Sequence, residues 1–306
     1  MAALLVFALS LGGCQLLQRD GVILLLDGSY RASLLGGAND GFAAPDGLVW
    51  RDGKLYVADE GTSTVAVWSR SAGRRSLADA KLGISTPEDV VAGPDGELFF
   101  TDDKSGGVWE VDASGKAFLL AGRERGLAST EGIALSPKGT LMVGETGGNR
   151  ILEVDRTGAV SVFLGPEHGL RKPESMAFDE QGNLFIADNE DDVLYLRSLD
   201  GTLHELVRRD GFSPETITYA GGTLYMTDSK NGKLFRYTAQ AGLETIAVFG
   251  GRLKRVSGIT TDPLGGIYLS VQSGSAGVPG YILHLEKSAA AAHSCGRPGA
   301  AACRKA

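Results

Sequence analysis

Short runs of apolar residues recur along the chain at a nearly constant interval, separated by polar turns rich in glycine. The interval is clearest at the start of one apolar run in each repeat, and successive starts lie 42, 43, 43, 41 and 42 residues apart. These starts are Pro45, Pro87, Thr130, Pro173, Pro214 and Val256. A period of this length is typical of solenoids and propellers, so the content of one repeat decides between them.

Each repeat has the pattern of four short strands. The first strand leads into a turn such as Asp52-Gly53, which is a strong hairpin signal. The second, as at 97–101, is rich in aromatic and β-branched residues, and two more strands follow, as at 150–164. No segment keeps a helical period. We therefore predict an all-β fold, a six-bladed β-propeller with four-stranded blades, over residues 21–287.

The sixth repeat supplies only three strands, the last at 281–285. Two segments that precede the first repeat, 22–26 and 30–35, have the pattern of outer strands. At least one of them is expected to complete the last blade and close the ring, because an open edge would otherwise be exposed. The pattern does not choose between the two segments.

The amino terminus has the features of an export signal. Residues 2–11 are apolar but too few to span a bilayer, and they end in Leu11-Gly12-Gly13-Cys14. This tetrapeptide resembles a bacterial lipobox, which implies that residues 1–14 are a lipoprotein signal and that Cys14 is lipidated. The domain would then lie at the bacterial cell envelope, periplasmic or surface-facing, with a lipid anchor as its only membrane contact. Export signals begin with a positive charge, but no Lys or Arg precedes this apolar run. The alternative is that residues 2–11 are ordinary apolar residues that precede the domain.

The other two cysteines, Cys295 and Cys303, lie in an Ala-rich tail, residues 288–306, that we expect to be flexible. In an oxidising compartment they could close a small disulfide loop, and the alternative is two free thiols.

The composition narrows the range of possible partners. The net charge of −7 disfavours nucleic acid, which is bound through basic patches. A nucleophile elbow, a phosphate loop and a dinucleotide fingerprint are also missing from the sequence, so no organic cofactor is expected. A small-molecule substrate, a metal cation or an envelope protein remains.

Acidic residues follow the strand starts in five of the six repeats. In a propeller these positions share one rim around the central channel, and carboxylates crowded there call for raised pKa values or a bound cation. Oxygen ligands from several blades suit calcium, whereas the absence of a His or Cys cluster disfavours zinc, copper and iron. The alternative is that these carboxylates cap backbone N–H groups or pair with basic residues. The predicted metal ligands are Asp46, Glu88, Glu131, Glu174 and Glu215. Ser257 occupies the equivalent position in the sixth repeat.

A second ring of polar residues ends the second strands: Asp59, Asp102, Glu145, Asp188, Asp228 and Gln272. A short acidic side chain here ordinarily accepts hydrogen bonds from the following loop, which is the structural interpretation. The pair Asp188 and Asn189 is the best candidate of this ring for substrate contact. In the loops that enter each blade, Arg171 could grip a substrate and His168 could act as a base.

The stretch GETGGNRILEV at 144–154 resembles the NHL repeat, and residues 21–287 resemble the six-bladed superfamily of gluconolactonases, senescence marker protein and strictosidine synthase. This resemblance implies a divalent cation in the channel, held by a Glu, two Asn and an Asp from the inner strand starts, which polarises a lactone carbonyl. In this chain Glu stands where the family has Asn.

Two functions follow as hypotheses. One is a calcium-dependent, gluconolactonase-like hydrolase of a lactone or related ester, with Glu131 or His168 as the catalytic base. The other is a non-catalytic NHL-like scaffold that binds a protein or ligand at the cell envelope.

Overall fold

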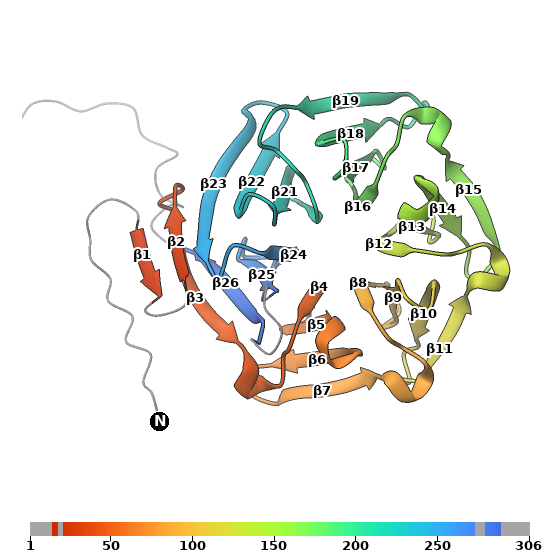
Figure 1. Ribbon diagram of the computed structural model, residues 1–306, viewed down its shortest axis with the longest axis horizontal. Helices are drawn as coiled ribbons and strands as arrows, with labels where there is room; N and C mark the ends of the chain where they lie inside the picture. The colour runs from red at the N-terminus through yellow and green to blue at the C-terminus, as the bar shows by residue number, and fades with distance from the viewer. Residues whose placement is uncertain (1–13, 18–20, 273–278, 289–306) are drawn as a thin grey trace, which may run out of the picture.

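The computed structural model describes residues 14–17, 21–272 and 279–288. Six antiparallel sheets surround a central axis, with the first strand of each sheet innermost (Figure 1). The predicted six-bladed β-propeller is confirmed. Within the described residues, none of the helices has the length and apolar content needed to cross a membrane.

The blades follow the repeats. Blade 1 contains β4 (Pro45–Arg51), β5 (Lys54–Asp59), β6 (Thr64–Ser69) and β7 (Gly73–Ala78). Blade 2 contains β8 (Pro87–Ala92), β9 (Leu98–Asp102), β10 (Gly107–Val111) and β11 (Ala117–Ala121). Blade 3 contains β12 (Thr130–Leu135), β13 (Leu141–Glu145), β14 (Arg150–Val154) and β15 (Val160–Leu164). Blade 4 contains β16 (Pro173–Phe178), β17 (Leu184–Asp188), β18 (Val193–Arg197) and β19 (Leu203–Arg208). Blade 5 contains β20 (Ile217–Ala220), β21 (Thr223–Asp228), β22 (Lys233–Thr238) and β23 (Gly242–Gly251). Blade 6 contains β24 (Val256–Thr261), β25 (Ile267–Val271) and β26 (Tyr281–Lys287).

The ring is closed by β3 (Tyr30–Gly36), which pairs antiparallel with β26 as the outer strand of blade 6. The other candidate segment, β2 (Gly21–Leu25), extends blade 5 instead by pairing with β23. The short β1 (Cys14–Leu17) pairs with β2 at the edge of the same sheet. The first and last repeats are thus joined through β3, so the amino-terminal part of the chain holds the ring shut.

Short 3-10 helices mark the rim loops: η1 (Ala38–Asp40), η2 (Glu60–Thr62), η3 (Ala80–Leu82), η4 (Arg123–Arg125), η5 (Thr146–Gly148) and η6 (Pro166–His168). Apolar side chains of neighbouring blades pack between the sheets, and one cluster joins Phe99 of blade 2 to Leu141 and Val143 of blade 3. The inner strands also touch one another directly. A Cβ at Gly132 would lie 2.1 Å from the carbonyl oxygen of Glu174, so glycine is needed where blades 3 and 4 meet.

Candidate functional site

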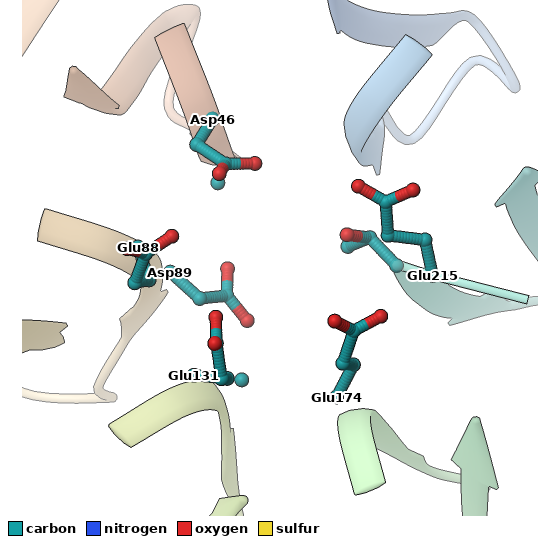
Figure 2. A pocket seen from close by; sticks show the side chains of 9 residues that line it. Asp46, Glu88, Asp89, Glu131, Glu174 and Glu215 are labelled. Atoms are coloured by element: carbon teal, nitrogen blue, oxygen red, sulfur yellow. The ribbon is translucent and has the colours of Figure 1, made fainter. Parts of the chain in front are cut away.

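The acidic residues at the strand starts converge as predicted. The five carboxylates line one cavity of about 50 Å³ at the mouth of the channel, each from a different blade. Figure 2 shows Asp46, Glu88, Glu131, Glu174 and Glu215 arranged around this cavity. A space of this size suits an ion or a few waters, and it is too small to hold a substrate.

Hydroxyl groups on the second strands fix the inner strands that carry these acids. Thr101 of blade 2 donates a hydrogen bond to the carbonyl of Glu131 in blade 3. Ser270 of blade 6 donates to the carbonyl of Asp46 in blade 1 at 2.5 Å. These bonds cross from blade to blade at the level of the carboxylates, so they hold the ring of acids in register.

The Thr101 bond can be tested by a shape-matched substitution. Thr101→Val is expected to lower the free energy of unfolding by about 2 kcal/mol, because it leaves the buried carbonyl of Glu131 and the amide of Asp89, which donates to Thr101 at 3.2 Å, without a partner. Urea unfolding measures the loss. Thr245→Val, at a partly buried threonine of β23, is the control and is expected to change stability by less than about 0.5 kcal/mol. An equal effect of both substitutions would contradict the assignment.

Crowding and burial disfavour ionisation in the cavity. Burial raises the pKa of Glu131 and of Glu215 to about 7, and the charge of Glu174 adds to the effect in both cases. Burial also raises the pKa values of Asp46, Glu88 and Glu174, although hydrogen bonding to Lys172 partly offsets the rise for Glu174. A cation in the cavity would favour the ionised carboxylates, which would in turn stabilise the cation.

Three carboxylates of the ring already have protein partners. Asp46 accepts hydrogen bonds from Ser257 and, at 2.9 Å, from Gln272, and Glu215 accepts one from Ser229. Glu174 pairs with Lys172 through Oε1. Its Oε2 is buried and has no hydrogen-bond partner among the described residues. Part of the ring thus has unused acceptor capacity.

The sequence interpretation missed one acid, Glu60. Carboxylate oxygens of Asp46, Glu60 and Glu88 lie within 4.8 Å of one another, which makes them the group of described residues best spaced to share a cation. Glu60 directly follows Asp59 and is the first residue of η2. Its position next to a second-ring acid is the signal in the sequence that could have found it.

The strand register corrects one member of the second ring. Val271 pairs with Val256 in blade 6, as Asp102 pairs with Pro87 in blade 2. Gln272 consequently occupies the channel-facing position of Glu60, and its amide donates to Asp46 at 2.9 Å and to Glu60 at 3.4 Å.

The acids of the second ring have the structural role considered in the sequence analysis, because they accept hydrogen bonds from neighbouring loops. Asp188 is fully buried, and its oxygens accept hydrogen bonds from the backbone of Arg171 at 2.8 Å and of Lys172 at 2.9 Å. Asp59, Asp102, Glu145 and Asp228 accept equivalent bonds from the loops that enter their blades. These carboxylates hold the rim loops in place, so the structure gives Asp188 a positioning role and does not bring it to the cavity.

The remaining predicted site residues lie around the rim, outside the cavity lining. His168 is exposed in η6, with Nδ1 at 3.3 Å from the carbonyl of Gly165 and 3.2 Å from a carboxylate oxygen of Glu167. Arg171 is exposed, and Asn189 is partly exposed at the position equivalent to Glu60. His168 and Glu131 are therefore not brought together.

The lipid on Cys14 and the disulfide between Cys295 and Cys303 stay predictions. The backbone of Cys14 lies in β1. Cys295 and Cys303 lie outside the described residues.

Comparison with known proteins places the fold. No protein-family model matches the chain, and no curated protein matches it in sequence. A gluconolactonase from Xanthomonas campestris is 16% identical, with a TM-score of 0.64 over 92% of this chain and 94% of that enzyme. A virginiamycin B lyase from Staphylococcus aureus is 16% identical, with a TM-score of 0.61 over 78% of this chain and 81% of the lyase. A PQQ-bound aldose sugar dehydrogenase from Streptomyces coelicolor is 17% identical, with a TM-score of 0.62 over 85% of this chain and 99% of the dehydrogenase.

The chain thus has the fold of the six-bladed propellers that include gluconolactonase, in agreement with the resemblance seen in the sequence. The three similar proteins are a gluconolactonase, a lyase and a dehydrogenase. The fold alone therefore does not identify a reaction for this chain. The acidic cavity has to carry the functional argument.

Proposed function

We propose that the acidic cavity holds one divalent cation, calcium, and that the protein is a metal-dependent hydrolase of a lactone or a related ester. The observation that carries the proposal is the convergence of five carboxylates from five blades on a single cavity of about 50 Å³. Their raised pKa values reflect burial and mutual repulsion, which a cation would relieve.

The side chains present fit a hard cation. Calcium binds six to eight oxygens in flexible geometry, and the lining offers only oxygen donors apart from the nearby ammonium of Lys172. The buried, unpartnered Oε2 of Glu174 supplies a free acceptor, and carboxylate oxygens of Asp46, Glu60 and Glu88 lie within 4.8 Å of one another. Such an ion would polarise a substrate carbonyl and so favour attack by water.

Two residues of this chain have properties suited to hydrolysis. Glu131, with its pKa raised to about 7 by burial, can take up and release a proton near neutral pH, as a general base must. Lys172 is held at the cavity by Glu174, and its ammonium can orient an anionic or carbonyl group of a substrate that sits above the mouth. Because the cavity itself is small, the substrate would lie on the rim.

A non-catalytic propeller scaffold is the second candidate. It is favoured by one observation, namely that Asp46, Glu174 and Glu215 already have hydrogen-bond partners within the protein. In that case the acids would stabilise the contacts between blades, and the rim would bind a protein or ligand. For either function we propose an envelope location through a lipid on Cys14.

Calcium binding is the test of the proposed function. Calorimetry on the full chain is expected to show about one calcium ion per chain, since one cavity collects the ligands. Glu88→Gln and Glu174→Gln are expected to weaken binding at least about tenfold, because each removes a charged ligand. Glu286→Gln, an exposed glutamate of β26, is the matched control and should bind like the unmodified chain. Absence of binding at millimolar calcium would overturn the metal site.

Turnover is tested separately on a panel of lactones and aryl esters. Hydrolysis that requires calcium and falls at least about a hundredfold in Glu131→Gln would support the assigned base, since general bases contribute about that much. Calcium binding without turnover of any member would instead favour the scaffold.

A further inference from the structure

The side-chain amide of Gln272 lies between two carboxylates of the channel mouth and a guanidinium of the rim. Its Nε2 donates to Oδ2 of Asp46 at 2.9 Å and to Oε2 of Glu60 at 3.4 Å. Its Oε1 accepts a hydrogen bond from Arg255 at 3.3 Å. Since acceptors surround the nitrogen and a donor faces the oxygen, the amide is held with its N–H groups toward the acids.

This orientation of the amide opposes cation binding. Asp46 and Glu60, together with Glu88, are the acids best spaced to share a cation, because their carboxylate oxygens lie within 4.8 Å of one another. The amide of Gln272 presents only donors to two of these acids. A cation among their oxygens would therefore face the positive end of the amide, which repels it. The amide has to turn before these three acids can share an ion.

A turned amide has the spacing of a calcium ligand. Rotation by half a turn about the Cγ–Cδ bond of Gln272 exchanges Oε1 and Nε2. The oxygen then takes the place of the nitrogen, which lies 2.9 Å from Asp46 and 3.4 Å from Glu60. Oxygens that bind one calcium ion at about 2.3–2.6 Å in a pentagonal bipyramid lie roughly 2.7–3.7 Å from their neighbours. Both distances fall within this range.

We propose that Gln272 is a ligand of the cation at the acidic cavity that turns its oxygen inward on binding, and that Arg255 opposes this turn. The inference rests on the proposed function, because it takes the calcium site as given. After the turn the NH₂ group of Gln272 faces the guanidinium, so two donors meet and their hydrogen bond is lost. The backbone N–H of Gln272 donates to the carbonyl of Arg255 at 3.0 Å, which keeps the two residues adjacent in both orientations. Because Arg255 is exposed, its opposition is weak enough for calcium to overcome.

Calorimetry of calcium binding to the full chain tests the role of Arg255. Arg255→Met is expected to tighten calcium binding about threefold more than Lys254→Met, the size of effect typical of an exposed charged hydrogen bond. Lys254→Met is the matched control, since it removes an equal charge from the neighbouring exposed residue. In a Gln272→Met background the two substitutions are expected to have equal effects, because Arg255 acts through the amide. Equal effects in the unmodified chain, or a difference that persists in the Gln272→Met background, would overturn this role.

A crystal structure of the unmodified protein with calcium tests the ligand directly. An amide atom of Gln272 is expected at about 2.3–2.6 Å from the ion, a distance at which it must be the oxygen. An amide farther than about 3.5 Å from a bound ion would overturn the inference and leave the proposed calcium site intact. Absence of calcium binding by the unmodified chain would overturn the proposed function, and this inference with it.

Discussion

In EDTA, the protein is expected to unfold more easily at about pH 8 than at about pH 5, by about 3 kcal/mol, and calcium is expected to remove most of this difference. The effect originates in the acidic ring. Glu131 and Glu215 have pKa values raised to about 7 by burial, whereas the same side chains ionise near 4.5 when unfolded.

The sign follows from proton binding. Between about pH 4.5 and about pH 7 the folded chain holds more protons on these carboxyls than the unfolded chain does, so the free energy of unfolding falls as the pH rises. Each pKa unit corresponds to about 1.4 kcal/mol. Because water reaches the carboxylates through the cavity, the combined loss is smaller than the sum over both groups. Calcium replaces the bound protons at high pH and restores stability by mass action.

Burial also raises the pKa values of Asp89, to about 6, and of Glu174 and Asp188, which adds to the trend, whereas other groups act outside this window or against it. The pKa values of Asp27 and Glu97 are lowered, with hydrogen bonds that outweigh the opposing effect of burial, so their contribution is lost only as the pH falls below the ordinary carboxyl range. Burial lowers the pKa of His284, which makes the protein more stable as the pH rises toward 6.5. This single partly buried histidine opposes the trend of the acidic ring without reversing it.

Urea unfolding across this pH range, with and without calcium, measures the effect. The double substitution of Glu131→Gln and Glu215→Gln is expected to reduce the pH dependence in EDTA, because an amide does not titrate. A free energy of unfolding that rises steadily from about pH 5 to about pH 8 in EDTA would contradict the electrostatic account of the ring.

The blade count and the acidic ring were predictable because both follow from repetition. A strand start that recurs every 42 or so residues places equivalent side chains on one rim, whatever the details of packing. The convergence of Glu88 and Glu131 on one cavity follows directly from that geometry.

Features that depend on register or on contacts between distant segments were not predictable. Segments 22–26 and 30–35 both have the sequence pattern of outer strands, and only the pairing of β3 with β26 distinguishes them. The place of Gln272 depends on the one-residue register of β25 against β24. A cavity of about 270 Å³ along the inner strands is lined by residues of all six blades, so no single repeat reveals it.

Asp59→Ala is expected to lower the free energy of unfolding by about 4 kcal/mol, more than any single change in the acidic ring. Asp59 is fully buried, and its carboxylate accepts hydrogen bonds from the N–H groups of Ala43 at 3.1 Å and Ala44 at 2.9 Å. It also lies 3.6 Å from the guanidinium of Arg74, which is itself largely buried. The substitution leaves two amides without their acceptor and removes the charge partner of Arg74, whose guanidinium keeps its hydrogen bonds to Thr62 and Thr64.

Urea unfolding of a double-mutant cycle with Arg74→Met separates the two contributions. If the unpaired cation carries part of the cost, Asp59→Ala is expected to cost less in the Arg74→Met background, because Arg74 no longer needs a partner. Asp210→Ala, at an exposed aspartate, is the control and should stay within about 0.5 kcal/mol of the unmodified chain. A loss below about 1 kcal/mol for Asp59→Ala would show that the loop before Asp46 holds its place without this carboxylate. The full loss would show instead that a buried acid that never faces the channel stabilises the loop that leads to Asp46.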